Sequence, residues 1–152
     1  MRSKAAFTLV EIMIVVSIIA LLAAIAVPSF LRARQRAQSS KFINNLRIAR
    51  DAFDTYAIEH QRYPADTYRG VIPPGMETYF GKNLNWQRTT PIGGNWDWEY
   101  AVFGITAGIS VASPSVSVEQ LREIDQQIDD GDLSAGSFRD QGLGRYTLVL
   151  QP

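Results

Sequence analysis

The sequence contains no cysteine and a single histidine among its 152 residues. Without cysteine the chain has no disulfide, no thiolate metal site and no cysteine nucleophile. The one histidine, His60, is too few for a metal site built from several imidazoles. No phosphate-binding loop, dinucleotide fingerprint or serine–histidine–acid set is visible in the order of the residues. The sequence therefore predicts a protein that is not an enzyme.

Net charge is also absent, because fifteen basic side chains balance fifteen acidic ones. A neutral chain gives no reason to expect direct contact with nucleic acid. The charges are unevenly placed, however: residues 1–50 hold eight basic groups and one acid, Glu11, whereas residues 51–152 hold seven basic groups and fourteen acids. The length suits one domain of ordinary size, but the uneven charge predicts two unlike parts.

Residues 7–27 form an apolar segment with one charged side chain, Glu11. As a helix this segment would be about 31 Å long, roughly the thickness of the hydrocarbon core of a bilayer. Because it is apolar on every face, lipid or other helices must surround it. We therefore expect a membrane-spanning helix.

Two other interpretations of residues 7–27 are a helix buried in the core and a secretory signal peptide. A helix buried in the core is disfavoured, since the rest of the chain is too small to enclose it. A secretory signal peptide fits the basic residues Arg2 and Lys4 and the small-x-small pattern at 24–26. Against it, the segment is long, and an acid inside it costs about 2.5–3.5 kcal/mol. Either Glu11 reaches the headgroups or it has a partner.

The helical pattern continues beyond Pro28, where we expect a kink. Apolar residues then recur at alternating spacings of four and three, which is typical of one face of an amphipathic helix. The sequence thus predicts one long helix from about Phe7 to about His60. The apolar face of its second half consists of Phe42, Leu46, Ala49, Phe53 and Tyr56.

The run Phe7-Thr8-Leu9-Val10-Glu11 follows a short basic leader and precedes the apolar segment with Pro28. This arrangement resembles the N-terminus of type IV pilins and type II secretion pseudopilins, over residues 1 to about 60. The resemblance implies cleavage by a prepilin peptidase between Ala6 and Phe7 and methylation of the new Phe7 amine. Glu11 then becomes the fifth mature residue. The family prefers glycine before the cut, where this chain has Ala6.

The resemblance also implies an α+β, pilin-like fold in which a long N-terminal helix packs on a small antiparallel sheet. The implied parts are a leader (1–6), a transmembrane helix (7–27), its amphipathic continuation (28–60) and a globular head (61–152). The implied partners are membrane lipid, related pilin-like subunits in a homopolymer, and an inner-membrane assembly platform with its ATPase. The protein would cross the inner membrane once, with the head extracytoplasmic, and assemble into a filament directed to the periplasm or the cell surface.

Basic residues that follow the span, such as Arg32 and Arg36, would by themselves favour the opposite orientation. The resemblance decides the orientation, because its motif is specific. These charges then either contact headgroups or acidic heads of neighbours, or form a solvated helix face.

If neighbouring subunits are staggered along their helices, Glu11 can act in the assembly of the filament. The carboxylate of one subunit would pair with the Phe7 amine of another, so that both charges are neutralised in a medium of low dielectric constant. Such a pair would fix the register of assembly.

The head is predicted to contain a strand near residues 96–102, with Trp96, Trp98 and Tyr100 facing a core and Asp97 and Glu99 facing solvent. A carbohydrate-binding platform made by the aromatic residues is the alternative. Further strands are expected at 105–112, 137–139 and 145–150, and a short helix after a capping Ser117.

Four acids form the one acidic cluster of the chain: Asp125, Asp129, Asp130 and Asp132. Closely spaced carboxylates suit Ca²⁺, although no glutamate closes an EF-hand loop. Calcium is the one cofactor to which the sequence points, and major pseudopilins hold a calcium late in the chain. The ion would replace the disulfide that closes this region in many pilins; a solvated turn is the alternative.

The function predicted from the sequence is that of a structural filament subunit. The absence of cysteine, the Tyr63-Pro64 pair and the acidic cluster favour a type II secretion pseudopilin. The alternatives are a type IV pilus pilin for motility, adhesion or DNA uptake, or a secreted binding protein with a signal peptide.

Overall fold

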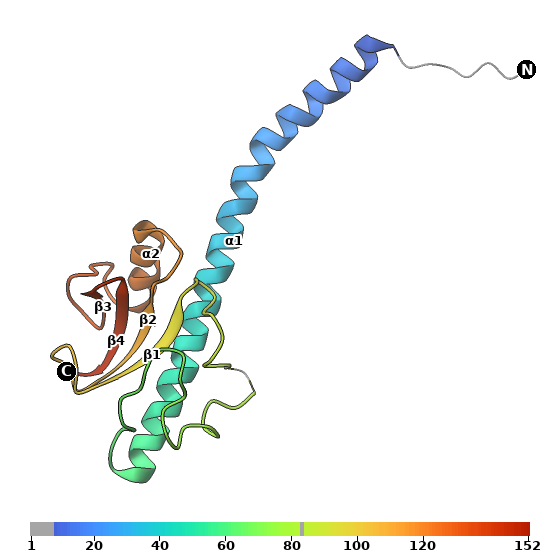
Figure 1. The fold of residues 1–152 in the computed structure, drawn as a ribbon. Coiled ribbons are helices and arrows are strands. Elements are labelled where there is room, and N and C mark those ends of the chain that lie inside the picture. The colour runs from blue at the N-terminus through green and yellow to red at the C-terminus, as the bar shows by residue number, and fades with distance from the viewer. Residues whose placement is uncertain (1–7, 83) are drawn as a thin grey trace, which may run out of the picture. The chain divides into compact units, whose positions relative to one another are not determined.

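The computed structural model describes residues 8–82 and 84–152. The chain divides into two compact units, Met1–Arg36 and Ala37–Pro152, and each is described by itself. Helix α1, Leu9–His60, runs through both units, as the sequence predicts (Figure 1). The predicted start of the helix near Phe7 and the predicted cleavage point at Ala6 lie outside the described residues.

The first unit is the N-terminal part of α1, and its apolar side chains are exposed from Leu9 to Leu31. Pro28 lies inside the helix, which continues past it. Over the described part of the chain, α1 is the one helix long and apolar enough to cross a membrane. Side chains of this kind need lipid or neighbouring helices around them, because exposing such a surface to water is unfavourable.

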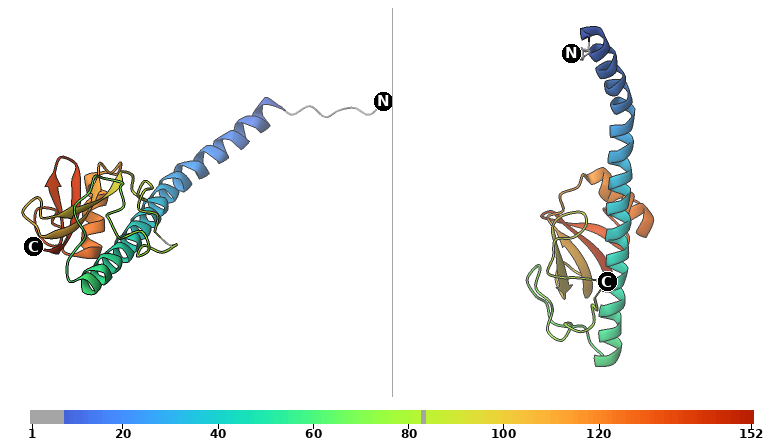
Figure 2. Two further views of the ribbon diagram at one scale, coloured as in Figure 1. Left: turned by 60° about the horizontal axis from the view of Figure 1, so that its bottom comes forward. Right: turned by 90° about the vertical axis from the view of Figure 1, so that its right-hand side faces the viewer.

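The second unit contains the rest of α1, a second helix and a sheet (Figure 2). The sheet has four antiparallel strands in the order β1-β2-β4-β3. The fold is therefore α+β, as predicted. The strands and the helix are β1 (Asn95–Tyr100), β2 (Ala107–Ala112), α2 (Val118–Ile128), β3 (Phe138–Gly142) and β4 (Arg145–Gln151).

The predicted apolar face of α1 is buried against one face of the sheet. Phe42 stacks on Trp96 with ring centroids 5.4 Å apart, and Phe53 stacks on Trp98 at 3.8 Å. Parallel stacking and burial of several large rings stabilise this core. Trp96 and Trp98 are almost fully buried, so the alternative of a carbohydrate-binding platform is wrong.

Helix α2 begins where the sequence predicts. Ser117 accepts a hydrogen bond from the Gln120 backbone N–H at 3.3 Å and so caps the helix. The Gln120 side-chain amide donates to Ser39 of α1 at 3.1 Å, and both residues are buried. This contact joins α2 to the long helix.

The long connection at 61–94 contains turns, as its proline and glycine content predicts. Residues 76–80 form hydrogen-bonded turns; for example, the Tyr79 N–H donates to the Met76 carbonyl. Apolar residues of the connection enter the core, where Trp86 packs edge-on to Phe53 at 5.4 Å. The connection thus completes the core beside the C-terminal part of α1.

The second face of the sheet differs from the prediction. Asp97 and Glu99 are 3% and 2% exposed instead of facing solvent. The residues at 101–106 fold back over this face: Ile105 is buried beside Gly108, and Phe103 covers the Arg145 guanidinium at 4.9 Å. Alternation along β1 separates two faces, but it does not reveal that another segment covers the polar one.

Arg145 balances these buried acids from β4. Its guanidinium lies 3.0 Å from the Asp97 carboxylate and also donates to Glu99. One cation between two buried acids leaves a negative charge uncompensated. Burial, followed by the charge of Glu99, raises the pKa of Asp97 to about 6.

Candidate functional site

The start of α1 is held by a reciprocal pair of contacts between Thr8 and Glu11. The Thr8 backbone N–H and hydroxyl each donate to the Glu11 carboxylate at 2.8 Å. The Glu11 N–H in turn donates to the Thr8 hydroxyl at 3.2 Å. This is a capping box, which satisfies backbone donors that the first turn of a helix otherwise leaves free.

The capping box gives Glu11 a partner inside its own subunit. The carboxylate lies in the first helical turn, where the partial positive charge of the helix dipole also favours it. The sequence interpretation missed this contact, although a threonine three residues before a glutamate is its usual signal. In the segment expected to enter the membrane, Glu11 is therefore already positioned and hydrogen-bonded before it meets another chain.

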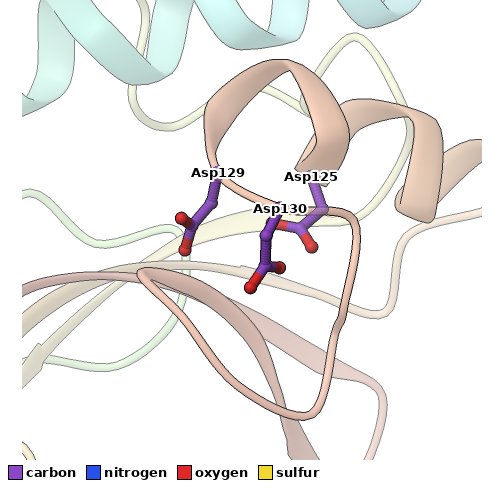
Figure 3. Close-up of side chains that lie close together, drawn as sticks. All are labelled: Asp125, Asp129 and Asp130. Atoms are coloured by element: carbon purple, nitrogen blue, oxygen red, sulfur yellow. The ribbon is translucent and has the colours of Figure 1, made fainter.

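The second candidate site is the acidic turn that follows α2. Asp125, Asp129 and Asp130 each offer a carboxylate oxygen within 4.8 Å of the others (Figure 3). Asp132, which the sequence placed in the same cluster, is not part of this group; its carboxylate accepts from the Ser134 N–H at 3.0 Å. The structure thus brings together three of the four predicted acids.

Asp125 is the residue of the turn that most needs a cation. Its side chain is fully buried, neither carboxylate oxygen makes a well-formed hydrogen bond, and the nearby Gly131 backbone N–H offsets only part of the rise in its pKa. Burial, then the charges of Asp130 and Asp129, raises the pKa of Asp125 to about 6. An unpartnered buried carboxylate is unfavourable unless a positive charge compensates it.

The loop after α2 is shaped around these carboxylates. Asp129 accepts a hydrogen bond from the Ser137 N–H. Gly136 has φ +73°, and a Cβ there would lie 2.0 Å from the Asp129 carboxylate. Three carboxylates offer the oxygen ligands that Ca²⁺ prefers, so the residues fit this ion.

Replacing Asp125 with asparagine separates the cost of the buried charge from calcium binding. Without calcium at neutral pH, we expect Asp125→Asn to be more stable than the unmodified chain by on the order of 2 kcal/mol, because the uncompensated charge is gone. With calcium, only the unmodified chain should gain several °C in melting temperature. Thermal unfolding in calcium and in chelator measures both effects.

The matched control is Asp132→Asn, which alters an exposed acid of the same turn outside the group of three. It should keep the calcium response. An unmodified chain whose melting temperature is the same in calcium and in chelator would contradict the metal site.

Comparisons with known proteins find similarity at the N-terminal end of this chain, which includes the start of α1. The sequence model described as the prokaryotic N-terminal methylation motif matches residues 1–27. The type II secretion system core protein G of Vibrio cholerae is 34% identical over 85 residues, which cover 56% of this chain and 54% of the relative. No solved structure gives a significant match.

Two further relatives show the breadth of the similarity. The type II secretion system core protein G of Aeromonas hydrophila is 32% identical over 41% of this chain and 44% of the relative. The type IV major pilin protein PilA of Myxococcus xanthus is 44% identical over 38% of this chain and 26% of the relative. The chain thus spans about half the length, or less, of these relatives. The predicted resemblance to type IV pilins and pseudopilins is confirmed.

Proposed function

We propose that this chain is a structural subunit of a type IV filament, most specifically a type II secretion pseudopilin. The observation that carries the proposal is the methylation motif at 1–27, which covers the start of α1, where the helix is apolar on all faces and has Glu11 in its first turn. In this proposal a prepilin peptidase cuts between Ala6 and Phe7, and Phe7 is then methylated. The subunits polymerise through α1.

The capping box gives the polymerisation step a defined starting state. In the free subunit Thr8 satisfies the Glu11 carboxylate. Removal of the leader creates a positively charged amine at Phe7. When a neighbouring copy approaches, its Phe7 amine takes the place of the Thr8 donors at Glu11, because two opposite full charges attract more strongly in a medium of low dielectric constant than a carboxylate and a neutral donor. The position of Glu11, the one acid in the apolar segment, then sets the register between neighbouring subunits.

Location and partners follow from the same helix. The subunit waits in the inner membrane as a single-pass protein with residues 37–152 on the extracytoplasmic side. Lipid then covers its apolar surface, which helices of other subunits cover after assembly. An inner-membrane assembly platform and an ATPase move it between these environments.

The acidic turn holds Ca²⁺ through Asp125, Asp129 and Asp130, and so stabilises the C-terminal part of the head without a disulfide.

A pseudopilus is favoured over a pilus by the relatives named as type II secretion core proteins and by the calcium-type turn. The similarity to a major pilin supports the second candidate, a pilus subunit. Deletion of the gene distinguishes the two. Loss of exoprotein secretion with surface pili unchanged supports the pseudopilus, whereas loss of surface pili or twitching with normal secretion supports the pilus.

The third candidate, a secreted protein that binds a glycan through surface aromatics, loses its basis because Trp96 and Trp98 are buried.

A further inference from the structure

The uncharged part of α1 ends at a cluster of three arginines. Twenty uncharged residues, 12–31, separate Glu11 from Arg32, and as a helix they rise about 30 Å, the thickness of a hydrocarbon core. Arg32, Arg34 and Arg36 follow directly, and all three are exposed. Glu11 and Arg32 thus mark the two ends of one hydrocarbon thickness.

The depth of these arginines matches the headgroup layer of a bilayer. That layer adds about 5–8 Å on each side of the hydrocarbon core, and the Cα atom of Arg36 lies about 6 Å beyond that of Arg32 along the helix. Helical side chains also lean toward the N-terminus, which here is the direction of the apolar segment. When residues 12–31 fill the hydrocarbon core, the guanidinium groups therefore lie at the level of the lipid phosphates.

The three arginines have no acidic partner among the residues that the structure describes. The ion pairs of that part of the chain involve other arginines, and the sequence has no acid between Glu11 and Asp51. Arg32 and Arg36 are one helical turn apart on the same face, where like charges repel each other. An anion between the two guanidinium groups removes this repulsion.

The same part of α1 carries a groove with one basic end and one apolar end. The groove has a volume of about 330 Å³ and is lined by Ile25, Pro28, Ser29, Arg32, Ala33 and Arg36. The small side chains of Ser29 and Ala33 leave space beside the two arginines, and Ile25 continues the groove onto the apolar segment. The basic end suits a phosphate, which arginine binds through paired hydrogen bonds, and the apolar end suits an acyl chain.

The distribution of charge around the helix favours lipid over a protein partner. Arg34 lies about 200° around the helix axis from Arg32, so guanidinium groups are present on opposite sides of α1. A neighbouring head would contact one side, whereas headgroups surround the whole helix, as lipid surrounds the apolar segment. Attraction to an anionic lipid surface is worth about fivefold in binding for each arginine.

We propose that α1 binds an anionic phospholipid of the extracytoplasmic leaflet, with the phosphate between Arg32 and Arg36 and an acyl chain along Ile25. The inference rests on the proposed function, because it requires α1 to span the membrane with residues 37–152 outside. The bound lipid fixes the depth of the subunit. Glu11, about 31 Å away along the helix, is then held at the cytoplasmic edge of the hydrocarbon core, where the next subunit meets it.

Native mass spectrometry of the full chain, kept in detergent with added lipid, tests this site. Phosphatidylglycerol and phosphatidylcholine both carry a phosphate, but only phosphatidylglycerol has a net negative charge. From equal amounts of the two lipids, the unmodified chain should retain at least about fivefold more phosphatidylglycerol. Inorganic phosphate should not displace this lipid, because free phosphate has no acyl chain to pack beside Ile25.

Paired substitutions locate the site on the helix. Arg32→Gln with Arg36→Gln should lower the retention of phosphatidylglycerol to that of phosphatidylcholine. The matched control, Arg47→Gln with Arg50→Gln, removes the same charge from exposed positions and should keep the preference, since Arg47 lies about 22 Å beyond Arg32 along α1. Both variants should keep the helical circular dichroism of the unmodified chain.

Three results would overturn the lipid site. The first is normal retention of phosphatidylglycerol by the Arg32→Gln, Arg36→Gln variant together with fewer filaments, which would assign these arginines to a neighbouring subunit. The second is an equal loss of retention in the control variant, which would make the effect one of overall charge. The third is displacement by inorganic phosphate, which would make the occupant a free anion.

The N-terminus of the same purified chain separates the lipid site from the proposed function. A chain with a methylated Phe7 and no preference for phosphatidylglycerol would overturn the lipid site alone. A chain that begins at Val27 lacks the apolar segment and would overturn the proposed function together with the lipid site.

Discussion

Replacing Glu11 with alanine should leave the subunit in the membrane but reduce filament yield by at least a hundredfold. The variant removes the one carboxylate of the apolar segment, so the Phe7 amine of a neighbour would be buried without a partner. Breaking a buried ion pair in this way costs about 3–5 kcal/mol, and the apolar surface that drives insertion is unchanged. Membrane fractionation measures insertion, and electron microscopy of sheared material measures filaments.

Thr8→Ala is the matched control for this prediction. It removes the hydroxyl of the capping box and weakens the start of the helix by about 1 kcal/mol, but it keeps the carboxylate. Filaments should therefore still form. Normal filament yield from Glu11→Ala would contradict the proposed pairing, and equal loss in both variants would assign the effect to the helix start alone.

Arg145→Met should destabilise the head by about 3–5 kcal/mol at neutral pH. The substitution keeps much of the apolar stem but leaves Asp97 and Glu99 buried without a cation. Unfolding by urea, followed through the fluorescence of the chain's three tryptophans, measures the change. The three side chains are buried, so their emission reports loss of the core.

The loss of stability in Arg145→Met should depend on pH in a defined direction. The pKa of Asp97 in the folded state, about 6, already lies above its ordinary value. The folded protein therefore binds a proton more readily than the unfolded chain, so this group destabilises the head as the pH rises through 6. Loss of Arg145 should widen the difference between the pKa of Asp97 in the folded protein and its pKa in the unfolded chain. The variant should therefore recover part of its stability near pH 5.

A triple variant supplies the control for Arg145. Adding Asp97→Asn and Glu99→Gln to Arg145→Met removes the uncompensated charges and should restore most of the stability. An Arg145→Met variant as stable as the unmodified chain at neutral pH would contradict the account of this face of the sheet.

The parts of the fold that depend on local periodicity could be predicted from the sequence. The spacing of Phe42, Leu46 and Phe53 indicates which face of α1 is buried, because a helix brings these residues together whatever the rest of the chain does. The strands expected at 137–139 and 145–150, which form β3 and β4, and the capping Ser117 are likewise local features. Each of these predictions is confirmed.

The burial of Asp97 and Glu99 could not be predicted in the same way. It depends on Ile105 and Phe103, which fold back over the sheet, and on Arg145, which is forty-six residues from Glu99 in sequence. Contacts over such separations leave no periodic signal. The cleft lined by Ile43, Gln127 and Leu148 is also formed by elements far apart in sequence.

The candidate sites were predicted in part for the same reason. Asp125, Asp129 and Asp130 are close in sequence and meet at one helix end, so their grouping follows from helix geometry. Asp132 is equally close, but its carboxylate is turned toward Ser134 by a local hydrogen-bonded turn. The Thr8–Glu11 contact has a short-range signal, a threonine three residues before a glutamate, but the sequence interpretation weighed only headgroups and another chain as surroundings for Glu11.

The most direct test of the filament-subunit account is the chemical identity of the mature N-terminus. Mass spectrometry of the N-terminal peptide, taken from protein isolated from the native membrane, reads it without any assay of assembly. The account predicts a chain that begins at Phe7 with a methylated amine. A chain that begins at Val27, after a signal-peptidase cut, or that retains Met1 through Ala6 in assembled material would contradict it.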